Sequence, residues 1–328
     1  MPFSEIVGHE KQLASLRWAL EKDRLHHAYL FLGPEGVGKR TVARSLAMAV
    51  QCREEASDSC GGCVSCVRIR SGNHPDVRVV EPAVGKKEIT IHQVRELERD
   101  LNYRAFVGRR KIAIVDPASL MNLSAQNALL KTLEEPPKDS LLILLSTSAG
   151  GLLPTLVSRC LRLSFAPLPS EIVASFLVTR RGLPREEAEL LAAVSMGSLG
   201  RAVHPEMEEL ARKRKAWAEK IASLTPTDCR GWIGLAEEFA SEREESLKFL
   251  EWVEGWYRDI LIYAVTGSNR GISNLDMEKD IKAQAEGYSL ERTLFLFSQA
   301  GRTAASIRRN FNRRMALEGF FAHVVGLH

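Results

Sequence analysis

The first half of the chain alternates short apolar runs with segments of helical periodicity. Apolar runs typical of buried strands lie at residues 28–32, 77–80, 112–115 and 141–145. Helical patterns separate them at 41–50, 92–103 and 124–135. Near-continuous apolar runs are typical of parallel strands that helices cover on both faces. The pattern therefore predicts an α/β domain with a parallel sheet over residues 1–167.

The second half of the chain has helical periodicity and few strand signals. The tripeptide Pro167-Leu168-Pro169 breaks the pattern and precedes a helix start. Long charged helical patterns begin near Pro205, and 300–323 is predicted to form one helix. We therefore expect a small helical domain at 168–205 and a larger helical domain at 206–328.

The composition is that of an ordinary globular protein. Of the 328 residues, 45% are hydrophobic and 26% are charged. The formal net charge of +4 is too small to indicate nucleic-acid binding by itself. No run of about 18 apolar residues is present, so we expect no membrane helix. The first residues lack the basic start and apolar core of a signal peptide, so we expect a cytoplasmic location.

A glycine-rich loop follows the first predicted strand and opens a predicted helix. Its chemistry-bearing residues are Gly33, Gly36, Gly38 and Lys39. This is the context that a phosphate-binding P-loop requires, because glycines let backbone N–H groups approach phosphate and a helix N-terminus favours negative charge. Lys39 would reach the outer phosphates. The alternative is a tight strand-to-helix turn that only resembles a P-loop.

Two positions of this ATPase pattern are altered. Arg40 stands where a Ser or Thr hydroxyl would ligate Mg²⁺, and a guanidinium cannot ligate a cation. Thr41 is not expected to replace it, because one step along a helix rotates a side chain by about 100°. Asp116 ends a strand where a metal-associated acid would lie, or else caps the following turn. Pro117 follows where a hydrolysing enzyme has Glu. These residues predict nucleotide binding at best, with poor metal binding.

Four cysteines lie close together after the P-loop helix. They are Cys52, Cys60, Cys63 and Cys66, with the spacing C-x7-C-x2-C-x2-C. Four thiolates joined by short turns are typical of a structural Zn²⁺ site, and an all-cysteine set leaves no open position for catalysis. His74 in place of Cys52 and redox-active thiols are the alternatives. We expect the two remaining cysteines, Cys160 and Cys229, to be small buried side chains.

Five further motifs along the chain point to a known protein family. They are Ile6-Val7-Gly8-His9, the segment 26–31, His74-Pro75-Asp76, the segment 127–137 and Ser158-Arg159-Cys160. With these motifs the chain resembles the delta-prime subunits of bacterial DNA polymerase III clamp loaders, a branch of the AAA+ ATPases. The resemblance runs from Phe3 to about Phe321. It implies an AAA+ domain with a zinc module inserted at 52–66, then a helical lid and a helical collar that joins subunits.

The resemblance also implies roles for single residues. Arg159 would be an arginine finger that enters a neighbouring subunit's ATP site and stabilises charge on the transferring phosphoryl group. Thr147, or Ser146 before it, would be the sensor-1 residue, and Arg201 the sensor-2 residue. The alternatives are that Arg159 caps a helix or pairs with an acid, and that Arg201 is a solvated side chain at a helix start.

The departures from the family pattern favour a subunit that hydrolyses little ATP by itself. Gamma/tau subunits have an intact Lys-Thr pair and an Asp-Glu pair, whereas this chain has Lys39-Arg40 and Asp116-Pro117. The implied partners are gamma/tau-type ATPase subunits and the delta subunit, with the sliding clamp and primed DNA reached through the complex. Two alternatives stay open. One is a gamma/tau-like ATPase, and the other is a stand-alone DNA-binding AAA+ protein.

Overall fold

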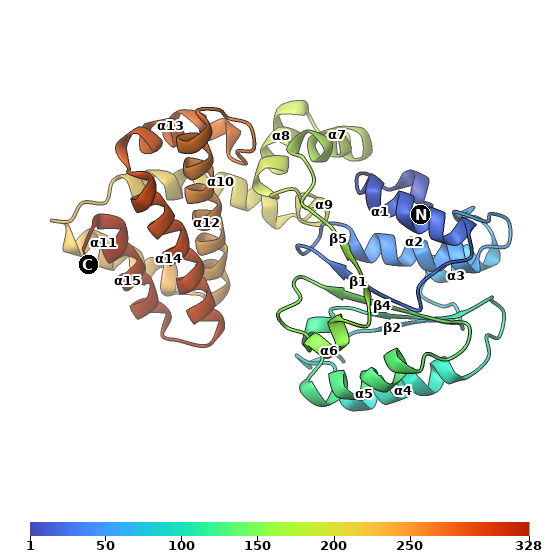
Figure 1. Ribbon diagram of the computed structural model, residues 1–328. Helices are drawn as coiled ribbons and strands as arrows, with labels where there is room; N and C mark the ends of the chain where they lie inside the picture. Colours follow the sequence, from blue (N-terminus) through green and yellow to red (C-terminus); the bar gives the residue numbers. More distant parts are fainter. Residues whose placement is uncertain (328) are drawn as a thin grey trace. The chain divides into compact units, whose positions relative to one another are not determined.

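The computed structural model describes residues 1–327, apart from the side chains of Glu206 and Glu208 (Figure 1). The chain forms two compact units. The first comprises residues 1–180 with 197–201, and the second comprises 181–196 with the residues from 202 onward. Among the described residues, no helix is long and apolar enough to cross a membrane. The division into three domains at 167 and 205 stays a prediction.

The first unit contains a parallel sheet of five strands. The strands are β1 (Ala28–Leu32), β2 (Val77–Val80), β3 (Lys111–Val115), β4 (Ser140–Ser146) and β5 (Leu161–Ser164). Their order is β2-β3-β4-β1-β5, and every neighbouring pair is parallel. The α/β prediction and its four strands are confirmed. The hydrophobic pattern does not predict β5, because this edge strand is largely exposed and is not an apolar run.

Helices cover both faces of this sheet, as predicted for a parallel α/β domain. The helices of the first unit are α1 (Glu10–Glu21), α2 (Lys39–Gln51), α3 (Val64–Arg70), α4 (Ile91–Asn102), α5 (Leu123–Glu134), α6 (Pro154–Val157) and α7 (Ser170–Arg181). Along β1, Tyr29 and Phe31 pack in the core with α2, whereas Ala28 and Leu30 pack with α4 and α5. Figure 1 shows α1–α3 on one side of the sheet and α4 and α5 on the other. Burial of alternate residues on opposite faces explains the continuous apolar run of β1.

The second unit is helical. Its helices are α8 (Arg185–Val194), α10 (Glu206–Ala222), α11 (Cys229–Ala240), α12 (Arg243–Thr266), α13 (Glu278–Gly287), α14 (Leu290–Arg308) and α15 (Arg313–Val325), while the short α9 (Leu199–Ala202) lies at the boundary between the units. Trp252 and Trp256 of α12 are buried and stack with ring centroids 5.5 Å apart. Trp217 of α10 packs against Trp252 at 5.6 Å. Trp252 and Trp256 therefore belong to the core of this unit.

Two predictions in the second half are wrong. The single helix at 300–323 is two helices, because α14 ends at Arg308 and Asn310 adopts a left-handed conformation with φ of 64°. Asn312 then caps α15, since its side chain accepts a hydrogen bond from Met315 N at 3.1 Å. Cys229 is exposed at the start of α11 and not buried, because Asp228 caps this helix at a solvent-facing end. Cys160 is buried, as predicted.

Candidate functional site

The carboxyl edge of the sheet brings the predicted ATPase-type residues together. The P-loop leaves β1 at this edge, and Gly33 N donates a hydrogen bond to Ser146 O at the end of β4 over 3.2 Å. Asp116 follows β3, and its N donates to Val80 O at the end of β2 over 2.9 Å. Parallel strands all end on the same edge, so the fold places the P-loop, Asp116 and the end of β4 side by side.

The P-loop backbone requires its glycines. Gly36 and Gly38 have φ angles of 71° and 116°, which favour glycine. Gly36 also lies against the segment Gly197–Arg201, because Gly200 N donates to Gly36 O at 2.8 Å. A Cβ atom on Gly36 would lie 2.4 Å from Ser198 Oγ. The structure therefore brings the segment Gly197–Arg201, which contains the predicted sensor-2 residue Arg201, onto the P-loop. Within this segment Arg201 N donates to Ser198 Oγ at 3.2 Å.

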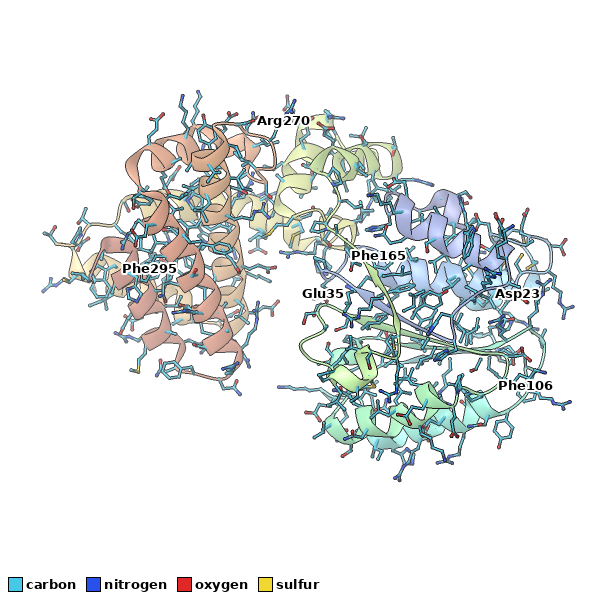
Figure 2. The ribbon with its side chains drawn as sticks, in the orientation of Figure 1. Asp23, Glu35, Phe106, Phe165, Arg270 and Phe295 are labelled. Carbon is cyan, nitrogen blue, oxygen red and sulfur yellow. The ribbon has the colours of Figure 1, made fainter. Side chains whose placement is uncertain are left out.

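The lysine of the loop is bound by the loop itself. Lys39 Nζ donates to Gly33 O at 2.5 Å and to Pro34 O at 2.6 Å, and the residue is only 8% exposed. Burial lowers the pKa of Lys39, while the charges of Asp116 and Glu35 oppose this effect. Glu35 lies at the tip of the loop (Figure 2). The ammonium group therefore finds its hydrogen-bond acceptors within the protein.

Arg40 lies between two carboxylates at the sheet edge. Its Nε donates to Asp116 Oδ2 at 2.5 Å, and its Nη2 donates to Glu81 Oε1. Glu81 directly follows β2, as Asp116 directly follows β3. Partial burial lowers the pKa of Arg40, but the hydrogen bonds and charges of Asp116 and Glu81 raise it above its ordinary value. One guanidinium thus neutralises the acids at the ends of two adjacent strands.

The other predicted nucleotide-site residues differ in exposure. Thr41 and Thr147 are exposed, whereas Ser146 is buried. Ser146 Oγ donates to Ser148 O at 2.6 Å, so this hydroxyl has a partner within its own loop. Roles for these residues and for Arg201 stay predictions.

Two further residues lie at this edge that the sequence did not predict to contact the site. Glu81 is one, and His9 is the other, since its Nε2 lies 2.8 Å from Val37 O within the P-loop. The His9 ring also packs edge-on against Phe165 with centroids 5.0 Å apart. The signal for Glu81 was available, because it is an acid immediately after a predicted strand. His9 belongs to the motif Ile6-Val7-Gly8-His9, but that motif does not predict a contact with the P-loop, because only the fold brings His9 there.

Arg159 follows α6 and contacts the end of α5. Its Nη2 lies 2.6 Å from Glu134 Oε1, and its Nη1 donates to Thr155 O at 2.8 Å. The Arg159 side chain is 35% exposed and that of Glu134 is 51% exposed. The structure therefore shows the pairing with an acid that the sequence left open, and it leaves part of the guanidinium accessible.

The four clustered cysteines form a possible metal centre. The sulfur atoms of Cys52, Cys60, Cys63 and Cys66 all lie within 4.8 Å of one another. A tetrahedral zinc site with Zn–S bonds of about 2.3 Å has sulfurs roughly 3.8 Å apart, so this donor set fits zinc. Hydrogen bonds from the backbone of Cys63 and Gly62 lower the pKa of Cys60 to about 7, which favours the thiolate. Burial raises the pKa of Cys66.

The cysteine cluster lies far from the P-loop. Cys52 follows α2 and Cys63 precedes α3, whereas the P-loop precedes α2. The 13 residues of α2 span about 20 Å at 1.5 Å per residue. Asp58 ties the cluster to the N-terminus by accepting hydrogen bonds from Phe3 N at 2.7 Å and Ser4 N at 3.2 Å. A metal here would brace the fold and would not touch nucleotide.

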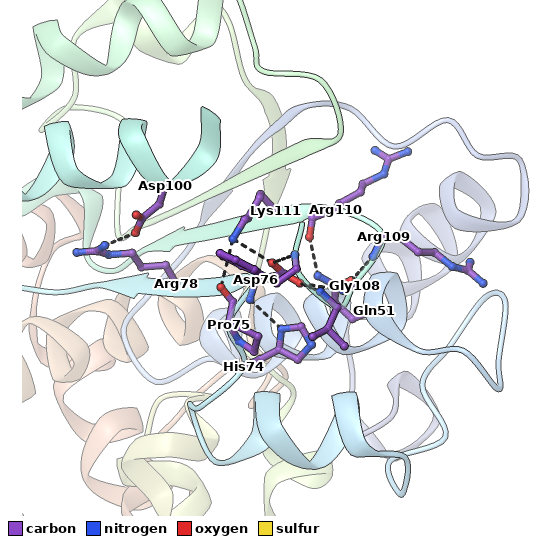
Figure 3. A network of polar contacts seen from close by, with 12 residues as sticks. Gln51, His74, Pro75, Asp76, Arg78, Asp100, Gly108, Arg109, Arg110 and Lys111 are labelled. Atoms are coloured by element: carbon purple, nitrogen blue, oxygen red, sulfur yellow. Dashed lines mark hydrogen bonds and ion pairs between the residues drawn. The ribbon is translucent and has the colours of Figure 1, made fainter. Parts of the chain in front are cut away.

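The His74-Pro75-Asp76 motif orders the loop before β3 (Figure 3). Asp76 accepts hydrogen bonds from the backbone N atoms of Phe106, Val107 and Gly108 at 2.7, 2.8 and 2.8 Å, and pairs with Lys111 Nζ at 2.9 Å. Burial opposes its ionisation, but the hydrogen bonds from Gly108, Phe106 and Val107, together with Lys111, hold the pKa of Asp76 at about 2. Phe106 itself is 76% exposed at the surface (Figure 2).

His74 supports this loop and not the cysteine cluster. Its Nδ1 accepts a hydrogen bond from Asp76 N at 3.1 Å. Among the residues that the structure describes, the group that could hold a metal consists of the four cysteines and does not include His74. The cysteine set is therefore complete without the alternative ligand His74.

Similar proteins place the chain in a family. The family model described as "DNA polymerase III, delta subunit" matches residues 8–169. The DNA polymerase III subunit delta' of Pseudomonas aeruginosa is 35% identical over 309 residues, which cover 92% of each chain. The chain belongs to the delta-prime family of DNA polymerase III subunits.

Delta-prime and tau/gamma relatives differ in how much of this chain they match. The delta-prime subunit of Bacillus subtilis is 28% identical over 310 residues, which cover 94% of this chain and 92% of the relative. The tau/gamma subunit of Haemophilus influenzae is 35% identical over 203 residues, which cover 60% of this chain and 29% of the relative. The similarity to delta-prime subunits therefore extends along nearly the whole chain, and that to tau/gamma covers only part of it.

Proposed function

We propose that the chain is a clamp-loader subunit that supplies Arg159 to the ATP site of a neighbouring gamma/tau-type subunit. Together with the delta subunit, this assembly would load the sliding clamp onto primed DNA. The observation that carries the proposal is the partly exposed guanidinium of Arg159, in a chain of the delta-prime family. An arginine is always charged at neutral pH and binds phosphate oxygens through several donors, which suits a trans-acting finger.

The surroundings of Arg159 support this role. Its partners in the chain are the exposed Glu134 and the carbonyl oxygen of Thr155. An exposed ion pair contributes only about 0.2–1 kcal/mol, so Arg159 can exchange Glu134 for a phosphate at little cost.

The chain's own P-loop site would hydrolyse little ATP. Pro117 cannot orient an attacking water as a glutamate would, and Arg40 pairs with Asp116. We propose that this site contributes structure to the ring, and that turnover occurs in the neighbouring subunits.

A structural Zn²⁺ would be held by Cys52, Cys60, Cys63 and Cys66. When bound, it would cross-link the end of α2 to the start of α3 through four thiolates. We further propose a lid at 168–205, a collar at 206–328 that joins subunits, and a cytoplasmic location.

The experiment is ATPase measurement on a reconstituted complex with gamma/tau-type and delta subunits, clamp and primed DNA. We expect Arg159→Ala to lower DNA-stimulated turnover severalfold. Arg24→Ala is the matched control, because Arg24 is an exposed arginine for which the structure gives no side-chain partner, and it should leave turnover unchanged. Full turnover with Arg159→Ala in a complete complex would refute the role.

Two measurements on the purified chain test the two alternative functions. ATP turnover by the chain alone, abolished by Lys39→Ala, would favour a gamma/tau-like ATPase. Tight, salt-sensitive DNA binding by the chain alone would favour a stand-alone DNA-binding protein. We expect neither result.

A further inference from the structure

At the P-loop site, the positively charged side chain of Arg40 lies between the acids Asp116 and Glu81. Arg40 is the first residue after Lys39, and its guanidinium contacts both Asp116 and Glu81. The Asp116 side chain is only 17% exposed, whereas those of Arg40 and Glu81 are 47% and 46% exposed. Asp116 therefore has its charge satisfied inside the protein.

We infer that Arg40 replaces the divalent cation of this P-loop site and excludes Mg²⁺-bound nucleotide from it. Mg²⁺ requires oxygen ligands, and in P-loop proteins the hydroxyl after the lysine and the acid after a strand provide them. Here the hydroxyl is absent, and the acid is already paired with a fixed positive charge. A Mg²⁺ ion at Asp116 would have to displace the guanidinium and then lie beside it.

The rest of the loop is likewise occupied by internal contacts. Lys39 Nζ donates to Gly33 O and Pro34 O, and the Gly36 carbonyl accepts a hydrogen bond from Gly200 N. The Gly36 and Gly200 backbones touch, since a Cβ atom on Gly200 would lie 2.9 Å from Gly36 Cα. Both cations of the loop thus have protein partners, and the backbone at Gly36 is covered. These contacts order the loop without any metal.

Removing Arg40 should create a metal site from the same acids. Glu81 and Asp116 both lie within reach of one guanidinium, so without it two like charges face each other at the sheet edge. Carboxylate oxygens are preferred ligands of Mg²⁺ and Mn²⁺. A divalent cation would then restore the attraction that Arg40 provides. This inference stands on the P-loop contacts and is independent of the role proposed for Arg159.

The test uses the full chain and the probe Mn²⁺, with and without ADP. The variants are Arg40→Thr, which restores the hydroxyl, and Arg40→Gln, which removes only the charge. Arg44→Thr is the control, because it lies on the same helix and the structure gives its side chain no ionic partner. Mn²⁺ binding is measured by electron paramagnetic resonance, and thermal unfolding is measured with and without Mg²⁺.

We expect both Arg40 variants to bind Mn²⁺ at least tenfold more tightly than the wild type and the Arg44→Thr control. Added Mg²⁺ should raise the melting temperature of the Arg40 variants and leave that of the wild type unchanged. Equal Mn²⁺ affinity in the wild type and Arg40→Thr would overturn the inference. So would Mg²⁺-dependent ADP binding by the wild type, and this measurement decides the question even if a variant fails to fold.

Discussion

Arg159 and Glu134 form an ion pair between the end of α6 and the end of α5, with 2.6 Å between Nη2 and Oε1. Both belong to motifs that the family resemblance singled out, one in Ser158-Arg159-Cys160 and the other in the segment 127–137. Arg159 is partly exposed and Glu134 is exposed, so the pair is weak. Under the proposed function, Glu134 competes with a neighbour's phosphate for the same guanidinium.

The first prediction follows from this competition. Glu134→Gln removes the competing charge, so the complex should gain up to about fivefold in kcat/KM for ATP, the equivalent of about 1 kcal/mol. The gain should appear in kcat, because Arg159 acts on charge that develops on the transferring phosphoryl group in the transition state. Steady-state ATPase kinetics of the reconstituted complex measure both constants.

Glu135→Gln is the matched control, since Glu135 is the adjacent, exposed acid and the structure gives it no side-chain partner. It should leave both constants unchanged. A fall in kcat with Glu134→Gln would contradict the competition and would make Glu134 a residue that positions Arg159.

The second prediction concerns the cysteine cluster. Cys66→Ser should lose the metal and lower the melting temperature, because serine is a poor zinc ligand and the site joins two helices. Cys229→Ser should change neither, since Cys229 is exposed and lies outside the cluster. Zinc content by atomic emission and thermal unfolding give the answer. We expect close to one zinc per chain in the wild type, and a metal-free wild type as stable as the zinc-loaded one would argue against a structural site.

The third prediction is a pH dependence set by Asp76. Its pKa is about 2 in the folded protein and has an ordinary value of 3.8. A group whose folded pKa is depressed contributes stability above its unfolded pKa and loses it as pH falls through the folded value. The contribution is about 2 kcal/mol, present above roughly pH 4 and lost toward pH 2.

Asp76→Asn should therefore lower the free energy of unfolding near pH 7 and flatten its decline between pH 4 and pH 2. An amide also places an N–H₂ group among backbone N–H donors, which adds to the loss. Asp100→Asn is the control, because the Asp100 side chain forms only an exposed ion pair with Arg78. Denaturant unfolding at several pH values measures the effect, and parallel pH profiles for Asp76→Asn and the wild type would disprove the assignment.

The sequence predicted the sheet well and the site in part. Apolar runs located β1, β3 and β4 because both faces of these strands are buried, and they located β2 because its valines are at least partly buried. The same reasoning could not find the exposed edge strand β5. The P-loop was predicted because glycine and lysine have fixed spacing. The partners of Arg40 were not, because Glu81 lies 41 positions away and only the strand order brings it close.

The same limit explains the failed prediction in the second half. Residues 300–323 have continuous helical periodicity, so the hydrophobic pattern cannot locate a break in them. The break depends on Asn310, which adopts a left-handed backbone, and on the cap at Asn312. Asparagine tolerates both conformations better than most residues, so the pair of asparagines was the available signal.

The fourth prediction tests the helical unit. Arg214 of α10 is 1% exposed, and its guanidinium donates to Asn274 Oδ1 at 3.0 Å and to Asp276. Arg214→Ala leaves these groups without their donor and opens a cavity, so we expect a loss of about 2–4 kcal/mol in the free energy of unfolding. Lysine should not rescue it, because an ammonium cannot span both partners as a guanidinium does. Arg212→Ala removes an exposed arginine of the same helix and should cost less than about 0.5 kcal/mol. Equal losses for the two alanine variants would show that the buried guanidinium contributes nothing specific to this unit.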